Sequence, residues 1–129
     1  MSYKISKELF EAVMNVKLTT DLSIAPYYNE VNGCEEEDLI LINYNFIWIP
    51  LDTFFFKCKE WAFEKSYGKH TTMNTMYDLR TRTRNRVDWS CDIVEDCGDG
   101  KTIKTIYANS EQQSVFNACQ WILDNKDKQ

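Results

Sequence analysis

The arginines are the sharpest chemical feature of the sequence, because all four fall within one seven-residue window. They occupy every second position, as Arg80, Arg82, Arg84 and Arg86. On an extended strand their guanidinium groups would project from one face. A row of guanidinium groups can hold phosphate or carboxylate oxygens through paired hydrogen bonds. The spacing therefore predicts an arginine stripe that binds an anion or a partner.

A solvated strand face accounts for the same pattern. Asp78, Asp88 and Asp92 follow the same alternation as the arginines and could neutralise them. A turn inside the window would also splay the four side chains apart. The sequence leaves both questions open: whether residues 80–86 are a strand or a turn, and whether their side chains bind a ligand.

The acidic residues could form a binding surface of the opposite sign. One group follows the turn dipeptide Asn32-Gly33, and the other lies around residues 92–99. Together they comprise Glu35, Glu36, Glu37, Asp38, Asp92, Glu95, Asp96 and Asp99. A solvated loop is the alternative explanation for residues 35–38. The formal net charge of −5 fits docking on a basic partner and makes direct binding to nucleic acid unfavourable.

The residue types needed for common catalytic and metal chemistry are dispersed along the chain. His70 is the only histidine, and its neighbours do not supply the carboxylate and nucleophile of an acid–base set. The five cysteines lack the close pairs of a structural zinc site. Cys97 lies beside Asp96 and Asp99, whose charges oppose thiolate formation. We therefore expect a protein that is not an enzyme and uses neither cofactor nor metal.

Composition predicts one folded domain over residues 1–129. Hydrophobic residues make up 43% of the chain and aromatic residues 14%, which suffices for a core. No apolar run approaches the roughly 18 residues that span a bilayer. The first ten residues are charged and lack the apolar core of a signal peptide. With an odd number of cysteines, the chain is expected to be cytoplasmic and to make no contact with a membrane.

Three stretches have the apolar spacing of α-helices. Ser6 is the expected N-cap of the first. Pro50 opens the second, and Gly68 is expected to end it. Ser110 and Gln113 match the capping box that starts the third.

Two strands are expected between the first and second helices. Residues 24–31 predict an edge strand, because Pro26 cannot donate to a ladder. Residues 39–49 predict one long strand with a bend near residue 43 or 45. They are apolar on both faces, which is typical of a central strand.

Three more strands are expected between the second and third helices. Residues 71–95 keep one alternating phase, which predicts two antiparallel strands joined around residues 81–85, or a single bent strand. Residues 101–108 then form a hairpin with residues 87–95. The order α-β-β-α-β-β-β-α predicts an α+β fold, a mostly antiparallel sheet of five strands with three helices packed on it.

Several segments resemble small phage- and prophage-encoded α/β sandwich proteins. They are Lys57-Cys58-Lys59-Glu60-Trp61-Ala62 in the second helix, Lys7-Glu8-Leu9-Phe10-Glu11-Ala12-Val13 in the first, and Ala108-Asn109 followed by Ala118-Cys119. The resemblance implies a sandwich of helices and strands and carries no catalytic residues. It favours an accessory protein that binds a host or phage protein, for example as an inhibitor of host machinery. The alternative is a module that binds a phosphorylated ligand or nucleic acid through the arginine stripe.

Overall fold

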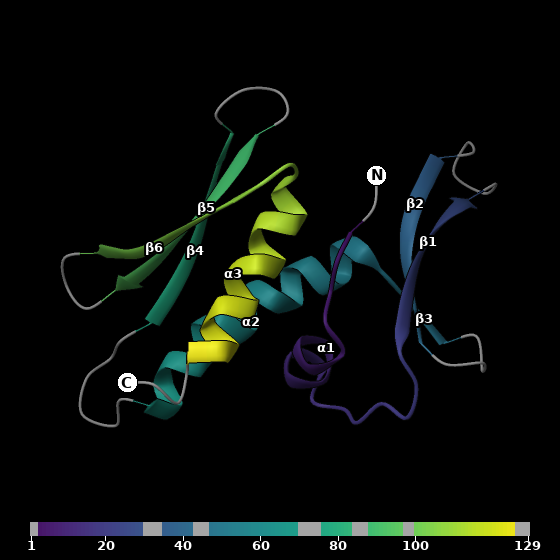
Figure 1. Ribbon diagram of the computed structural model, residues 1–129, viewed down its shortest axis with the longest axis horizontal. Coiled ribbons are helices and arrows are strands. Elements are labelled where there is room, and N and C mark those ends of the chain that lie inside the picture. Colours follow the sequence, from purple (N-terminus) through teal and green to yellow (C-terminus); the bar gives the residue numbers. More distant parts are fainter. Residues whose placement is uncertain are drawn as a thin grey trace.

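The computed structural model describes residues 3–29, 35–42, 47–69, 76–83, 88–96 and 100–125. Within these residues lie three helices, with three strands after each of the first two (Figure 1). In order they are α1 (Lys7–Met14), β1 (Leu22–Asn29), β2 (Glu35–Ile42), β3 (Ile47–Pro50), α2 (Leu51–Lys69), β4 (Met76–Thr83), β5 (Trp89–Asp96), β6 (Lys101–Ala108) and α3 (Glu111–Asn125). The predicted α+β class is confirmed.

The strands form two antiparallel sheets in place of the single five-stranded sheet expected. One sheet has the order β1-β2-β3 and the other β4-β5-β6. Figure 1 shows the first sheet at one end of the molecule and the second at the other, with the helices between them. The separation follows from α2, because its 19 residues carry the chain about 28 Å before β4 begins.

The sixth strand arises because residues 39–49 do not form one continuous strand. β2 ends at Ile42, and β3 folds back to pair with it, with Ile42 opposite Ile47. β2 also extends to Glu35, so the acidic run expected in a loop belongs to a strand. Of residues 39–49, predicted to be central, residues 39–42 are central because β2 pairs with β1 and β3, whereas residues 47–49 lie in β3 at the other edge. β1 lies at the edge of this sheet, as Pro26 predicts.

Helix ends follow local capping chemistry in α1. The Ser6 hydroxyl accepts the Leu9 N–H at 3.0 Å, which confirms the predicted N-cap. Asn15 closes the helix in the left-handed region, with a φ of 54°. Gly68, in contrast, lies inside α2, which continues to Lys69. A glycine costs a helix only about 1 kcal/mol relative to alanine, which is too little to terminate it unaided.

The predicted capping box of α3 is present in one direction only. The Ser110 hydroxyl accepts the Gln113 N–H at 3.1 Å. The Gln113 side chain does not return to Ser110. It binds the backbone of Lys4, where its Oε1 accepts the N–H at 2.7 Å and its Nε2 donates to the carbonyl oxygen at 2.9 Å. Gln113 therefore holds the N-terminal segment against α3.

A shared core joins the three helices to both sheets. Phe54 of α2 is fully buried between Phe10 of α1 and Phe116 of α3, at ring-centroid distances of 5.2 and 5.4 Å. Ile40 of β2 and Ile93 of β5 belong to the same buried cluster. Among the described residues, no helix is both long enough and apolar enough to cross a membrane.

Candidate functional site

The structure places half of the arginine stripe on a strand. Arg80 and Arg82 lie on β4, which ends at Thr83, and Arg84 and Arg86 lie outside the described residues. The expected pair of antiparallel strands within residues 71–95 is confirmed by the ladder between β4 and β5. Residues 81–83, expected in the turn around residues 81–85, belong to β4, and residues 84–85 lie outside the described residues.

Arg82 binds a carboxylate on the neighbouring strand. Its Nη2 lies 2.8 Å from Oδ2 of Asp92, whose side chain is only 12% exposed. The other carboxylate oxygen of Asp92 accepts the Thr105 hydroxyl at 2.8 Å. Thr105 stands opposite Asp92 in the β5–β6 ladder. Arg82 lies on β4, two residues beyond the position opposite Asp92, and therefore contacts Asp92 diagonally. Asp92 is therefore bonded on both oxygens and tied into the sheet.

Arg80 is paired on its own strand. Its Nε lies 2.9 Å from Oδ2 of Asp78, and both side chains are largely in solvent. The two described arginines thus already hold carboxylates, which reduces the positive potential available to an external anion. The arrangement is that of a largely self-neutralised sheet face.

Replacing Arg82 by serine is expected to lower the free energy of unfolding by about 1–2 kcal/mol, because Asp92 loses its charged partner while shielded from water. Arg80→Ser is the matched control on the same strand. It breaks an exposed pair and should cost no more than about 0.5 kcal/mol. Urea denaturation measures both, and equal costs for the two variants would contradict this assignment.

The predicted acidic residues do not form one surface. Residues 35–38 begin β2, whereas Asp92, Glu95 and Asp96 lie on β5. Figure 1 shows these strands at opposite ends of the molecule. Asp92 is moreover buried against Arg82 and Thr105. Asp99 lies outside the described residues.

The described cysteines lie in the core. Cys58, Cys91 and Cys119 are buried free thiols, which pack as small apolar side chains. The Cys119 thiol donates to the Cys58 carbonyl oxygen at 3.4 Å. Burial is the main cause that raises the pKa of Cys91 to about 12 and that of Cys119 well above its ordinary value. His70 and Cys97 lie outside the described residues, and no group of acidic, Cys or His side chains within them could hold a metal ion.

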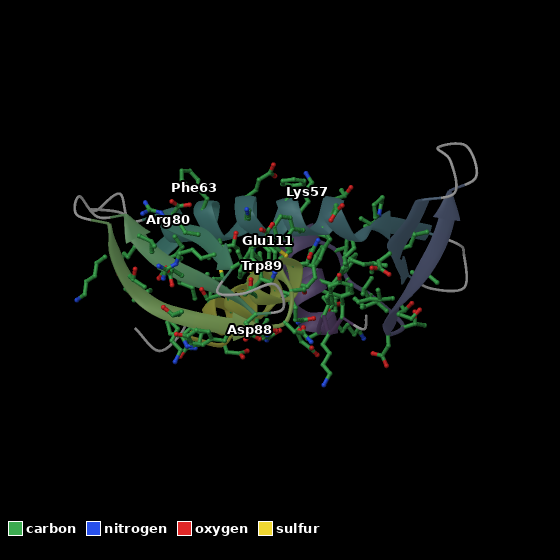
Figure 2. All side chains as sticks on the ribbon, turned by 90° about the horizontal axis from the view of Figure 1, so that it is seen from above. Lys57, Phe63, Arg80, Asp88, Trp89 and Glu111 are labelled. Carbon is green, nitrogen blue, oxygen red and sulfur yellow. The ribbon has the colours of Figure 1, made fainter. Side chains whose placement is uncertain are left out.

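Two exposed phenylalanines on α2 form a feature that the sequence analysis missed. Phe56 is 61% exposed and Phe63 is 45% exposed. A separation of seven residues places them within about 20° of each other around the helix. In Figure 2, Phe63 and Lys57 project outward from α2. The signal was present in the sequence, because helical spacing places both phenylalanines on the side opposite the apolar stripe that contains Phe54, Cys58 and Trp61.

Charged side chains surround the two phenylalanines, and we refer to Phe56, Phe63, Lys57 and Glu60 as the α2 outer face. Lys57 Nζ lies 3.8 Å from Glu60 Oε2. Lys59 is stacked over the ring of Phe55, 4.7 Å from its centroid. The surface thus combines exposed aromatic rings with a rim of mixed charge, a composition found where proteins bind one another.

In the described residues, this is an α+β protein in which a layer of helices joins two antiparallel sheets. Its longest helix, α2, carries an exposed aromatic patch. Comparisons of the chain with protein-family models, with curated proteins and with solved structures find no match.

Proposed function

We propose that this chain is a small non-enzymatic accessory protein, of the kind carried by phages and mobile elements, that binds another protein through the α2 outer face. The observation that carries the proposal is the exposure of Phe56 and Phe63 on one side of a helix whose other side is buried from Leu51 to Ala62. The partner would be a host or phage protein. By occupying it, the chain would block the partner's own interactions, as an inhibitor does.

A helix face of this kind suits a partner with an apolar groove. In helix-in-groove recognition, anchor side chains recur at intervals of three, four and seven residues along one side of the helix. Phe56 and Phe63 supply two anchors seven residues apart, and Lys57 and Glu60 lie between them at the rim. α2 is held by the core through Phe54 and Trp61, so its outer face requires little ordering on binding.

The anion-binding alternative has less support. Binding a phosphate would require Arg80 and Arg82 to release Asp78 and Asp92, or to share their charge with them. Release of Asp92 would leave a shielded carboxylate without its cation. Protein binding through α2 requires no such rearrangement.

A comparative pull-down tests the proposal. Wild-type protein and the double variant Phe56→Ser/Phe63→Ser serve as baits in an extract of the host, with quantitative mass spectrometry as the readout. We expect one or a few proteins to be retained by the wild type and reduced at least tenfold with the double variant, since two central aromatic anchors are lost.

Val16→Ser is the matched control, because Val16 is another exposed apolar side chain on a different part of the surface. It should retain the same proteins as the wild type. Equal melting temperatures for the three baits exclude unfolding as the cause. The same set of proteins retained by wild type and double variant would overturn the proposal.

A further inference from the structure

A groove of about 580 Å³ separates β1 from α3. Leu9 of α1 and Phe116 of α3, both buried, contribute apolar side chains to its lining. Leu22 and Ile24 of β1 form one wall, and the N-terminal residues 3–6 form another. In Figure 1 the N-terminal segment runs between the helices and the sheet that contains β1. The volume lies within the range of pockets that bind ligands.

The wall formed by β1 is an open sheet edge. Among the described residues, β1 pairs with β2 alone, in a continuous register in which Pro26 stands opposite Asp38. Proline has no N–H, so it belongs at a position whose backbone groups face away from the neighbouring strand. Antiparallel ladders alternate such positions at every second residue. Leu22 and Ile24 therefore direct their N–H and carbonyl groups to the open edge, beside the groove.

The opposite wall is also an extended backbone. The N–H and carbonyl groups of Lys4 both face α3, where Gln113 binds them. The Ser6 hydroxyl donates to Gln120 Oε1 at 2.6 Å and fixes the same segment one residue before α1. Because backbone groups alternate in direction along an extended chain, those of Tyr3 and Ile5 point away from Gln113. The groove is thus flanked by two extended segments with an apolar floor.

We propose that the groove binds an extended segment of a partner protein, which adds as a strand to the open edge of β1. The main chain of that segment would bond to Leu22 and Ile24, and every second side chain would enter the groove above Leu9 and Phe116. Pro26 offers no donor, which limits the docked strand to a short length. Lys4 is the one charged residue among the described residues that line the groove, so an acidic residue in the segment is favoured there.

This site is separate from the α2 outer face, since neither Phe56, Phe63 nor any other described side chain of α2 lines the groove. The two proposals can therefore fail independently. Loss of binding through Phe56 and Phe63 would leave strand addition at β1 unaffected. Loss of strand addition at β1 would likewise leave binding through the α2 outer face unaffected.

The test selects peptides from a display library of random sequences on the immobilised full chain. Enriched peptides are synthesised, and their affinity is measured by fluorescence anisotropy for wild type, Ile24→Pro and Ile24→Ala. Both variants lose the isoleucine side chain, and only the proline variant also loses the outward N–H. We expect enriched peptides with alternating apolar residues and an acidic residue, and affinity for Ile24→Pro about tenfold weaker than for Ile24→Ala.

The same pair of substitutions at Leu22 provides a second comparison if Ile24→Pro fails to fold, because proline is tolerated at the first residue of a strand. Equal affinities for the proline and alanine variants would overturn strand addition. So would enriched peptides without apolar alternation, the absence of enrichment, or a β1-dependent dimer in light scattering, which would assign the edge to a second copy of the chain.

Discussion

Replacing Phe54 by alanine is expected to lower the free energy of unfolding by about 3–5 kcal/mol. Phe54 is fully buried, and its ring contacts Phe10 at 5.2 Å and Phe116 at 5.4 Å between ring centroids. These contacts connect α1, α2 and α3. Alanine would remove the aromatic surface from all three helices at once and leave a cavity that neighbouring rings fill only in part.

Phe56→Ala is the control for this prediction, since the same substitution two residues away removes a side chain that is 61% exposed. Its effect should remain within about 0.5 kcal/mol. Urea denaturation followed by tryptophan fluorescence measures both variants. A cost for Phe54→Ala that resembles the cost for Phe56→Ala would contradict the central position of Phe54 in the core.

The free energy of unfolding is expected to fall as the pH rises above 9, with Cys91 contributing about 1.4 kcal/mol per pH unit. Burial, followed by the nearby Cys119 and Asp92, raises the pKa of Cys91 from 9.0 to about 12. Between these values the unfolded chain has released the thiol proton, whereas the folded chain still retains it. The folded state therefore binds more protons in this window, and rising pH favours unfolding. Below pH 9 the contribution is fully present.

Cys91→Ser isolates this contribution, because serine keeps a small polar side chain that does not titrate in this range. Between pH 9 and 12, the free energy of unfolding of the wild type should fall more steeply with pH than that of Cys91→Ser. Urea denaturation at successive pH values, with a reductant present, gives this difference. A difference that does not change with pH would show that the Cys91 thiol ionises as readily in the folded chain as in the unfolded one.

Local features of the fold were predictable, because residues close together in the chain create them. Ser6 and Ser110 cap their helices through N–H groups three residues away. Pro26 places β1 at an edge because a missing N–H is a property of the residue itself. The antiparallel pairing of β5 and β6 follows from their alternating residues and their proximity in the chain.

The candidate site was predictable only in part. The arginine spacing left open whether residues 80–86 are a strand or a turn, and the structure places Arg80 and Arg82 on β4 beside carboxylates that the spacing did not predict. Asp92 lies ten residues from Arg82 and reaches it only when β5 pairs with β4 in the observed register. The outward orientation of Phe56 and Phe63 was missed because apolar side chains are expected in the core, although both lie on the side of the helix opposite the buried Phe54. Which side is covered depends on how α1, α3 and both sheets pack against α2.

The sequence by itself determined the absence of close cysteine pairs, the three helices with the N-caps of the first and third, and the edge strand at Pro26. These properties depend on residue type and on spacings of a few residues. Only the tertiary structure decided that the strands divide into two sheets and that Arg82 is paired with Asp92. It also decided that Gln113 binds the backbone of Lys4, from which it is separated by 109 positions in the chain. Each of these depends on which segments, distant along the chain, pack against one another. The pattern of residues within one segment does not specify its distant partner.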